Sequence, residues 1–90
     1  MRKIVDPFTV NLPHLDLHGE GCFSLEFLIS SFINDSYKLK NEKIIIIHGK
    51  GSGMLRKKTH ELLKKNKKVK KYYIDGLNDG QTIVELYHNW

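Results

Sequence analysis

The sequence contains little cysteine and no long apolar run, and these shortages exclude several classes of protein. Cys22 is the single cysteine among 90 residues. A disulfide framework within the chain and a cysteine-based zinc site are therefore excluded, and a reducing compartment is expected. The longest unbroken apolar run is only four isoleucines, at residues 44–47, which is too short to span a bilayer. The first residues lack the apolar core of a signal peptide. We expect a cytoplasmic protein with no membrane partner.

Acidic residues are also scarce relative to basic ones. The chain has 15 Lys and Arg against 10 Asp and Glu, for a formal net charge of +5 and a pI near 9.4. A small basic domain favours an anionic partner, most often nucleic acid. Nine of the basic residues lie between residues 56 and 71, where Glu61 is the one acid. Lysine runs often only solvate a surface, but this density favours nucleic-acid binding over solubility alone.

The apolar patterns predict one small domain over residues 13–90, preceded by an N-terminal arm over residues 1–12. Strands are expected at 14–18, 44–47, 69–74 and 82–87, and helices at 23–39 and 53–66. The connection over residues 76–81 is too short for a crossover helix, so the last two strands should pair antiparallel. The predicted fold class is α/β (α+β): a two-layer sandwich of order β-α-β-α-β-β, with a four-stranded mixed sheet and two helices on one face.

Apolar stripes on the two predicted helices indicate which side chains face the sheet. On the second helix Ser52 is the expected N-cap, and His60 lies beside the stripe, where a surface position is expected. The first stripe comprises Leu25, Leu28, Ile29, Phe32 and Ser36, widened by Phe23, Phe27 and Ile33, and the second comprises Leu55, Thr59, Leu62 and Leu63.

Two apolar segments of similar design end in the pair His-Gly. The first segment ends at His18 and the second at His48, a separation that matches one β-α-β unit. If both segments are parallel strands, both histidines lie at the strand ends where open α/β sheets bind ligands. Either histidine alone would more simply be structural, and Asp16 would then accept a hydrogen bond from the following turn. The repetition favours a joint functional role.

A glycine-rich turn follows the second strand and leads into the basic helix. This strand–turn–helix order directs backbone N–H groups towards an anion. The turn matches neither GxxxxGK[ST] nor GxGxxG, so the standard nucleotide-binding motifs do not apply. The predicted ligands of a phosphate or nucleic acid are Gly49, Lys50, Gly51, Ser52, Gly53, Arg56 and Lys57.

Taken together, the motifs resemble those of Smr (small MutS-related) domains. The resemblance covers residues 12–86, and it is carried by Leu15-Asp16-Leu17-His18-Gly19, His48-Gly49-Lys50-Gly51-Ser52-Gly53, Leu55-Arg56 and Gly80-Gln81-Thr82-Ile83-Val84-Glu85-Leu86. It implies a sandwich similar to the C-terminal domain of translation initiation factor three. It also implies endonuclease activity, either nicking DNA or cutting mRNA at stalled ribosomes. The last loop departs from the family, which usually has more glycine than Asn78-Asp79-Gly80-Gln81.

The predicted function is therefore cleavage of single-stranded RNA, with Asp16, His18 and His48 as catalytic residues. His18, oriented by Asp16, would take the 2′-OH proton, and His48 would be the acid or a phosphate ligand. This chemistry requires no metal or other cofactor. A divalent metal held by Asp16, His18 and His48 is the alternative, and DNA as the substrate would favour it, because DNA lacks the internal nucleophile. The alternatives are a DNA-nicking endonuclease and a module that binds nucleic acid or the ribosome without cutting. RNA is favoured over DNA as the partner.

Overall fold

Six elements follow one another in the predicted order β-α-β-α-β-β. In a computed structural model that describes residues 12–17, 19–51 and 53–87, each lies close to its predicted bounds except at the start of β4. They are β1 (His14–Asp16), α1 (Cys22–Lys38), β2 (Lys43–Ile47), α2 (Met54–Lys65), β3 (Val69–Asp75) and β4 (Asn78–Leu86). The predicted N-terminal arm lies almost wholly outside the described residues.

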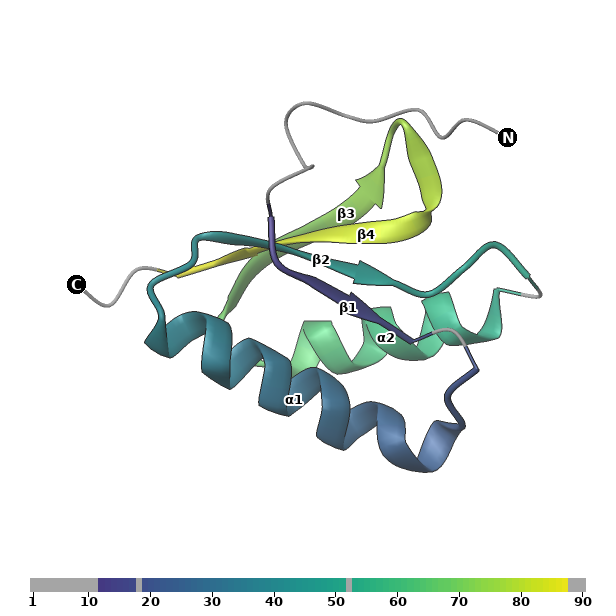
Figure 1. Ribbon diagram of the computed structural model, residues 1–90, viewed down its shortest axis with the longest axis horizontal. Coiled ribbons are helices and arrows are strands. Elements are labelled where there is room, and N and C mark those ends of the chain that lie inside the picture. The colour runs from purple at the N-terminus through teal and green to yellow at the C-terminus, as the bar shows by residue number, and fades with distance from the viewer. Residues whose placement is uncertain (1–11, 18, 52, 88–90) are drawn as a thin grey trace.

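The four strands form one mixed sheet in the order β1-β2-β4-β3 (Figure 1). β1 and β2 are parallel neighbours, with Asp16 opposite Ile47. β4 lies between β2 and β3 and is antiparallel to both. Each helix therefore connects two strands that point the same way, which brings the carboxyl ends of β1 and β2 to the same edge.

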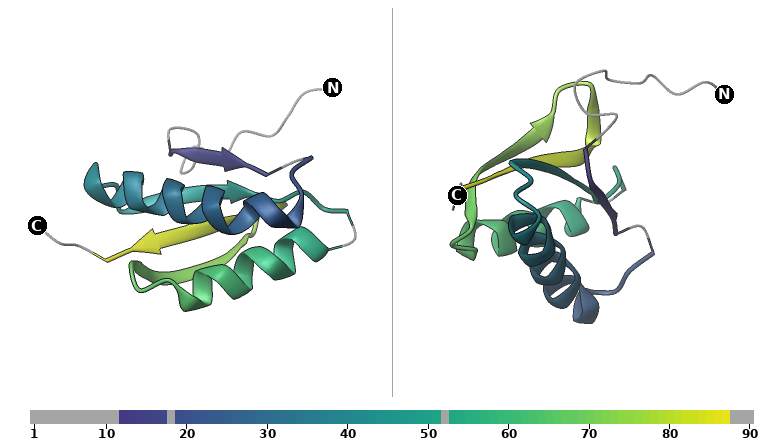
Figure 2. Two further views of the ribbon diagram at one scale, coloured as in Figure 1. Left: turned by 90° about the horizontal axis from the view of Figure 1, so that it is seen from below. Right: turned by 60° about the vertical axis from the view of Figure 1, so that its left-hand side comes forward.

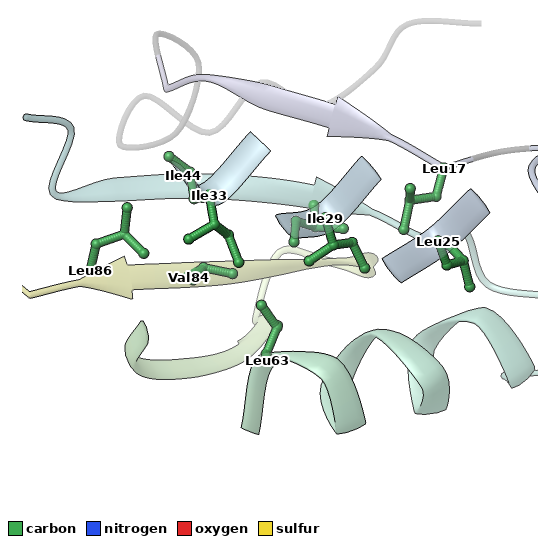
Figure 3. Packing of buried hydrophobic residues seen from close by; sticks show 9 residues of the cluster. Leu17, Leu25, Ile29, Ile33, Ile44, Leu63, Val84 and Leu86 are labelled. Atoms are coloured by element: carbon green, nitrogen blue, oxygen red, sulfur yellow. The ribbon is translucent and has the colours of Figure 1, made fainter. Parts of the chain in front are cut away.

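Both helices cover one face of this sheet, as Figures 1 and 2 show. Alternate residues of each strand face the helices, and the core lies between the layers (Figure 3). Its fully buried members come from four of the six elements and the residue after β1: Leu17, Leu25, Ile29, Ile33, Ile44, Ile46, Leu63, Val84 and Leu86. Thr59 of α2 is also fully buried. The predicted two-layer sandwich is confirmed.

The predicted stripe on α1 is too wide. Phe23 and Phe27 point to solvent, with 105% and 73% of their surface exposed, although their apolar character suggested core positions. The buried stripe instead follows Leu25, Ile29 and Ile33. Phe23 and Phe27 lie two residues from this line, and since a helix turns by about 200° over two residues they face away from the sheet.

Two element boundaries differ from the prediction in ways that affect the candidate site. β4 begins at Asn78, four residues before the predicted Thr82, because Asp75 pairs with Asn78 around a two-residue turn. The N-cap of α2 is Gly53, with φ of 84° and no side-chain capping bond. The predicted cap, Ser52, lies outside the described residues.

A buried polar pair stabilises the β3–β4 hairpin on the face away from the helices. Asp75 is only 3% exposed and accepts hydrogen bonds from the side chain of Gln81 at 2.7 Å and the backbone N–H of Leu77 at 2.9 Å. Because a buried carboxylate needs such partners, this pair holds the start of β4 against β3. No helix in the described part of the chain is long and apolar enough to cross a bilayer.

Candidate functional site

The ends of β1 and β2 meet at one edge of the sheet, as the two His-Gly corners predicted. The backbone N–H of Leu17 donates to the carbonyl of Ile47 at 2.8 Å, so the chain leaves both strands at the same level. His48 follows β2 directly. His18 follows Leu17 in the sequence but lies outside the described residues, so its predicted role stays a prediction.

The predicted catalytic residues Asp16 and His48 lie on opposite faces of the sheet. Leu15 and Leu17 contact the core, so Asp16 between them points away from the helices and is exposed. His48 has the orientation of the buried Ile46 and lies under α2, with only 3% of its surface exposed. Direct contact of both side chains with one atom of a ligand is therefore not supported by this arrangement.

Both ring nitrogens of His48 have hydrogen-bond partners within the protein. Nδ1 lies 2.9 Å from the carbonyl of Gly49, and Nε2 lies 2.8 Å from Oγ1 of Thr82. Because a carbonyl only accepts, Nδ1 carries the proton in the neutral ring, and Nε2 accepts from the Thr82 hydroxyl. His48 thus connects the start of the glycine turn to β4.

His60 was expected at the surface, but it contacts the same hydroxyl. It extends from α2 towards the sheet, is half-buried, and has its Nε2 2.8 Å from Oγ1 of Thr82. Its ring meets His48 edge to face at 6.0 Å and Tyr72 at 5.0 Å between centroids. With the Thr82 hydroxyl donating to His48, it accepts from Nε2–H of His60, which completes a hydrogen-bonded chain from α2 to Gly49.

The surroundings of the two imidazoles keep both of them neutral. Burial lowers the pKa of His48 below its ordinary value of 6.5, and the positive charge of Arg56 lowers it further against the opposing effects of the Gly49 carbonyl and Asp79. Burial also lowers the pKa of His60, with further lowering from His48 and Arg56. At neutral pH the pair therefore holds no charge of its own and leaves Arg56 as the main cation beside it.

The glycine turn is held against the β3–β4 hairpin by its backbone. The N–H groups of His48 and Gly49 both donate to the carbonyl of Gly80, at 3.0 and 2.8 Å. The predicted use of the Gly49 N–H for phosphate is thus not available in this conformation. Gly49 has φ of 81°, and a side chain on Gly80 would meet Lys50 and Gly49 at 3.3 and 3.5 Å, so both positions suit glycine.

Four predicted phosphate ligands line one small cavity of about 100 Å³ beside His48: Gly49, Gly51, Gly53 and Arg56. The guanidinium of Arg56 folds back over Gly53, where an added Cβ would meet its Nη2 at 3.2 Å. Lys50 makes an exposed ion pair with Asp79 at 3.2 Å. Lys57 is exposed on α2. An anion at this turn could therefore contact Arg56 directly, but it would compete with Asp79 for Lys50.

Three residues of the site were not predicted from the sequence: His60, Thr82 and Asp79. One signal could have identified His60, because it lies one helical turn after Arg56 on the same face of α2. No local signal marks Thr82, whose role depends on the register that sets β4 beside β2. Among the described residues no group of three or more His, Cys, Asp or Glu side chains is arranged to hold a metal ion.

Comparison with known families agrees with this geometry. The sequence model of the Smr domain matches residues 15–87, most of the chain. The chain belongs to the Smr domain family. Two similar proteins are the endonuclease MutS2 of Clostridium botulinum (strain Eklund 17B / Type B), 36% identical over 75 residues, and that of Geobacillus sp. (strain WCH70), 40% identical over 75 residues. Each match includes 80% of this chain but only 10% of the relative.

Solved structures of Smr domains share the fold. The Smr domain of Thermus thermophilus MutS2 superposes with a TM-score of 0.81 at 24% identity, with 84% of this chain and 99% of that chain covered. YdaL, a stand-alone small MutS-related protein from Escherichia coli, gives 0.76 at 23% identity, with 81% and 63% covered. At this level of identity the likeness establishes the fold of this Smr domain and no more.

Proposed function

We propose that this Smr domain is an endonuclease that binds and cleaves single-stranded RNA, with cytoplasmic mRNA on ribosomes as the natural target. The observation that carries the proposal is the position of Arg56. Its guanidinium lies over the glycine turn and close enough to His48 to lower its pKa. It stands at the edge where β1 and β2 both end. The name endonuclease borne by the MutS2 relatives supports the same class of reaction.

The reaction that fits these residues is an internal transesterification. His18, oriented by Asp16, removes the proton of the 2′-OH, and the resulting oxygen attacks the adjacent phosphorus. The bond from phosphorus to the 5′-oxygen breaks, and that oxygen takes a proton from solvent. The products are a 2′,3′-cyclic phosphate and a 5′-OH end. Arg56, and Lys50 once it is released from Asp79, offset the charge that develops on the phosphate oxygens. No metal takes part in these steps.

We assign His48 to positioning in place of direct proton transfer. Its two ring nitrogens are engaged by Gly49 and Thr82, and its surface is almost wholly buried. In this position it fixes the first peptide of the glycine turn, and so the place where a phosphate would meet Arg56. His48 was predicted to act as the acid or as a phosphate ligand. The second role fits this geometry better, although His48 would act on the phosphate indirectly, through the glycine turn that it holds in place.

Incubation of the purified domain with end-labelled single-stranded RNA tests the proposal. The expected result is cleavage that persists in EDTA and is absent from a DNA of the same sequence. His18→Ala should reduce the rate by at least about 100-fold while binding of an uncleavable 2′-O-methyl RNA is retained. His14→Ala is the matched control, because His14 lies exposed at the other end of β1 and its loss should leave the rate unchanged.

The other outcomes identify the alternatives. Cleavage at the wild-type rate by His18→Ala would remove His18 from the mechanism. Cleavage that EDTA abolishes, or nicking of DNA, would indicate the metal-dependent reaction. Binding without any cleavage would indicate a docking module for nucleic acid or ribosomes, an interpretation that the enclosure of His48 also favours.

A further inference from the structure

A groove runs along α2 beside β3, next to the cavity at the glycine turn. It has a volume of about 570 Å³ and is open to solvent. The residues that line it come from the turn, from α2 and from β3: Gly53, Arg56, Lys57, His60, Glu61, Lys64 and Tyr72. Gly53, Arg56 and Lys57 were predicted to bind a phosphate or nucleic acid, whereas the other four lining residues were not, so the groove extends beyond the predicted site.

The charges of the groove are strongly positive and mostly unpaired. Arg56, Lys57 and Lys64 make no ion pair with any described residue. Glu61 is the one acid that lines the groove. Its carboxylate lies 3.9 Å from Nζ of Lys58, a lysine that does not line the groove and that partly offsets the negative charge of Glu61. A site with three free cations attracts a ligand that carries more than one negative charge, as the sugar–phosphate backbone does.

The floor of the groove is aromatic. His60 and Tyr72 lie with their ring centroids 5.0 Å apart and their planes at 51°. Thr82 holds the inner edge of the imidazole at Nε2, and Nδ1 has no hydrogen-bond partner among the described residues. Two fixed rings among cations form a surface on which the base of a single strand can stack. A duplex would not offer a base in this way.

The groove is continuous with the cavity at the glycine turn, because Gly53 and Arg56 line both. From Arg56 to Lys64 the helix rises by about 12 Å. A strand with one phosphate at Arg56 therefore has room to continue along α2 towards Lys64, with a base lying between the two cations.

We propose that this α2 groove is a binding subsite for a nucleotide of single-stranded nucleic acid that flanks the phosphate held at the glycine turn. Its base stacks on His60 and Tyr72, and its phosphates contact Lys57 and Lys64. The subsite rests on the proposed function only for the statement that the phosphate at Arg56 is the one cleaved. Binding in the groove requires no cleavage.

Binding of a fluorescein-labelled, uncleavable 2′-O-methyl RNA, followed by anisotropy over a range of salt concentrations, tests the charges. The double variant Lys57→Gln/Lys64→Gln should weaken binding about tenfold or more and reduce the slope of log K against log salt by about 1.4, which corresponds to two lost phosphate contacts. The matched control is Lys38→Gln/Lys43→Gln, which removes two exposed lysines that do not line the groove. An equal effect of the two double variants would overturn the proposal.

The same RNA with 2-aminopurine at successive positions tests the stacking. One position should show fluorescence quenching that is lost in Tyr72→Leu, with affinity reduced by roughly tenfold. If that variant does not fold by circular dichroism, His60→Gln gives the same test, since an amide can still hydrogen-bond Thr82. Quenching that survives both substitutions would refute the stacking. These readouts are independent of cleavage, so loss of activity in His18→Ala, or its absence altogether, leaves them unaffected.

Discussion

His48 and His60 lie edge to face at the end of the core, with both of their Nε2 atoms 2.8 Å from the one hydroxyl of Thr82. His48 directly follows β2, whereas His60 lies on α2. The hydroxyl has a single proton, so it donates to one imidazole and accepts from the other. This arrangement suits two neutral rings, and a proton added to either ring introduces a charge beside Arg56.

The stability of the domain should fall as the solution becomes acidic. The pKa values of both histidines are lowered in the folded state, chiefly by burial. Below the unfolded pKa of about 6.5 the unfolded chain therefore binds protons that the folded chain does not. The stability that the two neutral histidines contribute is fully present above about pH 6.5 and is lost as the pH falls below it. Urea titrations at pH about 7.5 and about 5.5 measure this, and His48→Gln should reduce the difference. If His48→Gln left the difference in stability between the two pH values unchanged, His48 would not be a source of the acid sensitivity.

Substitution of Thr82 by valine should destabilise the domain by about 1–3 kcal/mol, because it leaves two imidazole nitrogens without their shared partner. Thr59 provides a matched control on α2. It is equally buried, but its Oγ1 has no hydrogen-bond partner among the described residues. Thr59→Val should therefore be neutral or stabilise the domain by up to about 1 kcal/mol. Urea midpoints of the two variants give the comparison. Equal destabilisation by both would show that the hydroxyl chain contributes nothing.

Removal of the charge of Asp79 should tighten nucleic-acid binding. The ion pair with Lys50 is exposed on both sides, so Asp79→Asn should change the free energy of unfolding by less than about 1 kcal/mol. The released lysine can then bind a phosphate, and the salt dependence of binding to single-stranded RNA should steepen by about 0.7. Asp35→Asn makes the same change of charge on α1. A steeper slope in both variants would indicate net charge alone as the cause.

A side chain at Gly53 should disturb both stability and binding. Its φ of 84° is unfavourable for alanine by about 1–2 kcal/mol, and the new Cβ would meet the guanidinium of Arg56 at 3.2 Å. Gly53→Ala should therefore lower the urea midpoint and weaken RNA binding. Gly21 caps α1 in the same way, but with φ of −87° and open space around it. Gly21→Ala should change stability by less than about 0.5 kcal/mol. Wild-type binding by Gly53→Ala would argue against Arg56 as the phosphate ligand.

The order of elements, the two layers and the common edge of β1 and β2 could all be predicted from the amino-acid sequence. Each of these follows from local pattern: a buried isoleucine run predicts a strand inside a covered sheet, and periodic leucines predict a helix lying on it. The glycine turn and the basic face of α2 could be predicted for the same reason, because turn chemistry and charge density are properties of short segments.

The contact between His48 and His60 could not be predicted in this way, because it depends on how α2 packs on the sheet. His48 and Thr82 are 34 residues apart. Their contact depends on the register of β4 beside β2, which the sequence pattern did not predict. His60 faces inward because α2 lies across that pair, and Phe23 faces outward because α1 presents a narrower stripe than its apolar residues suggested. The orientation of an element about its own axis depends on what it packs against, and no single segment contains that information.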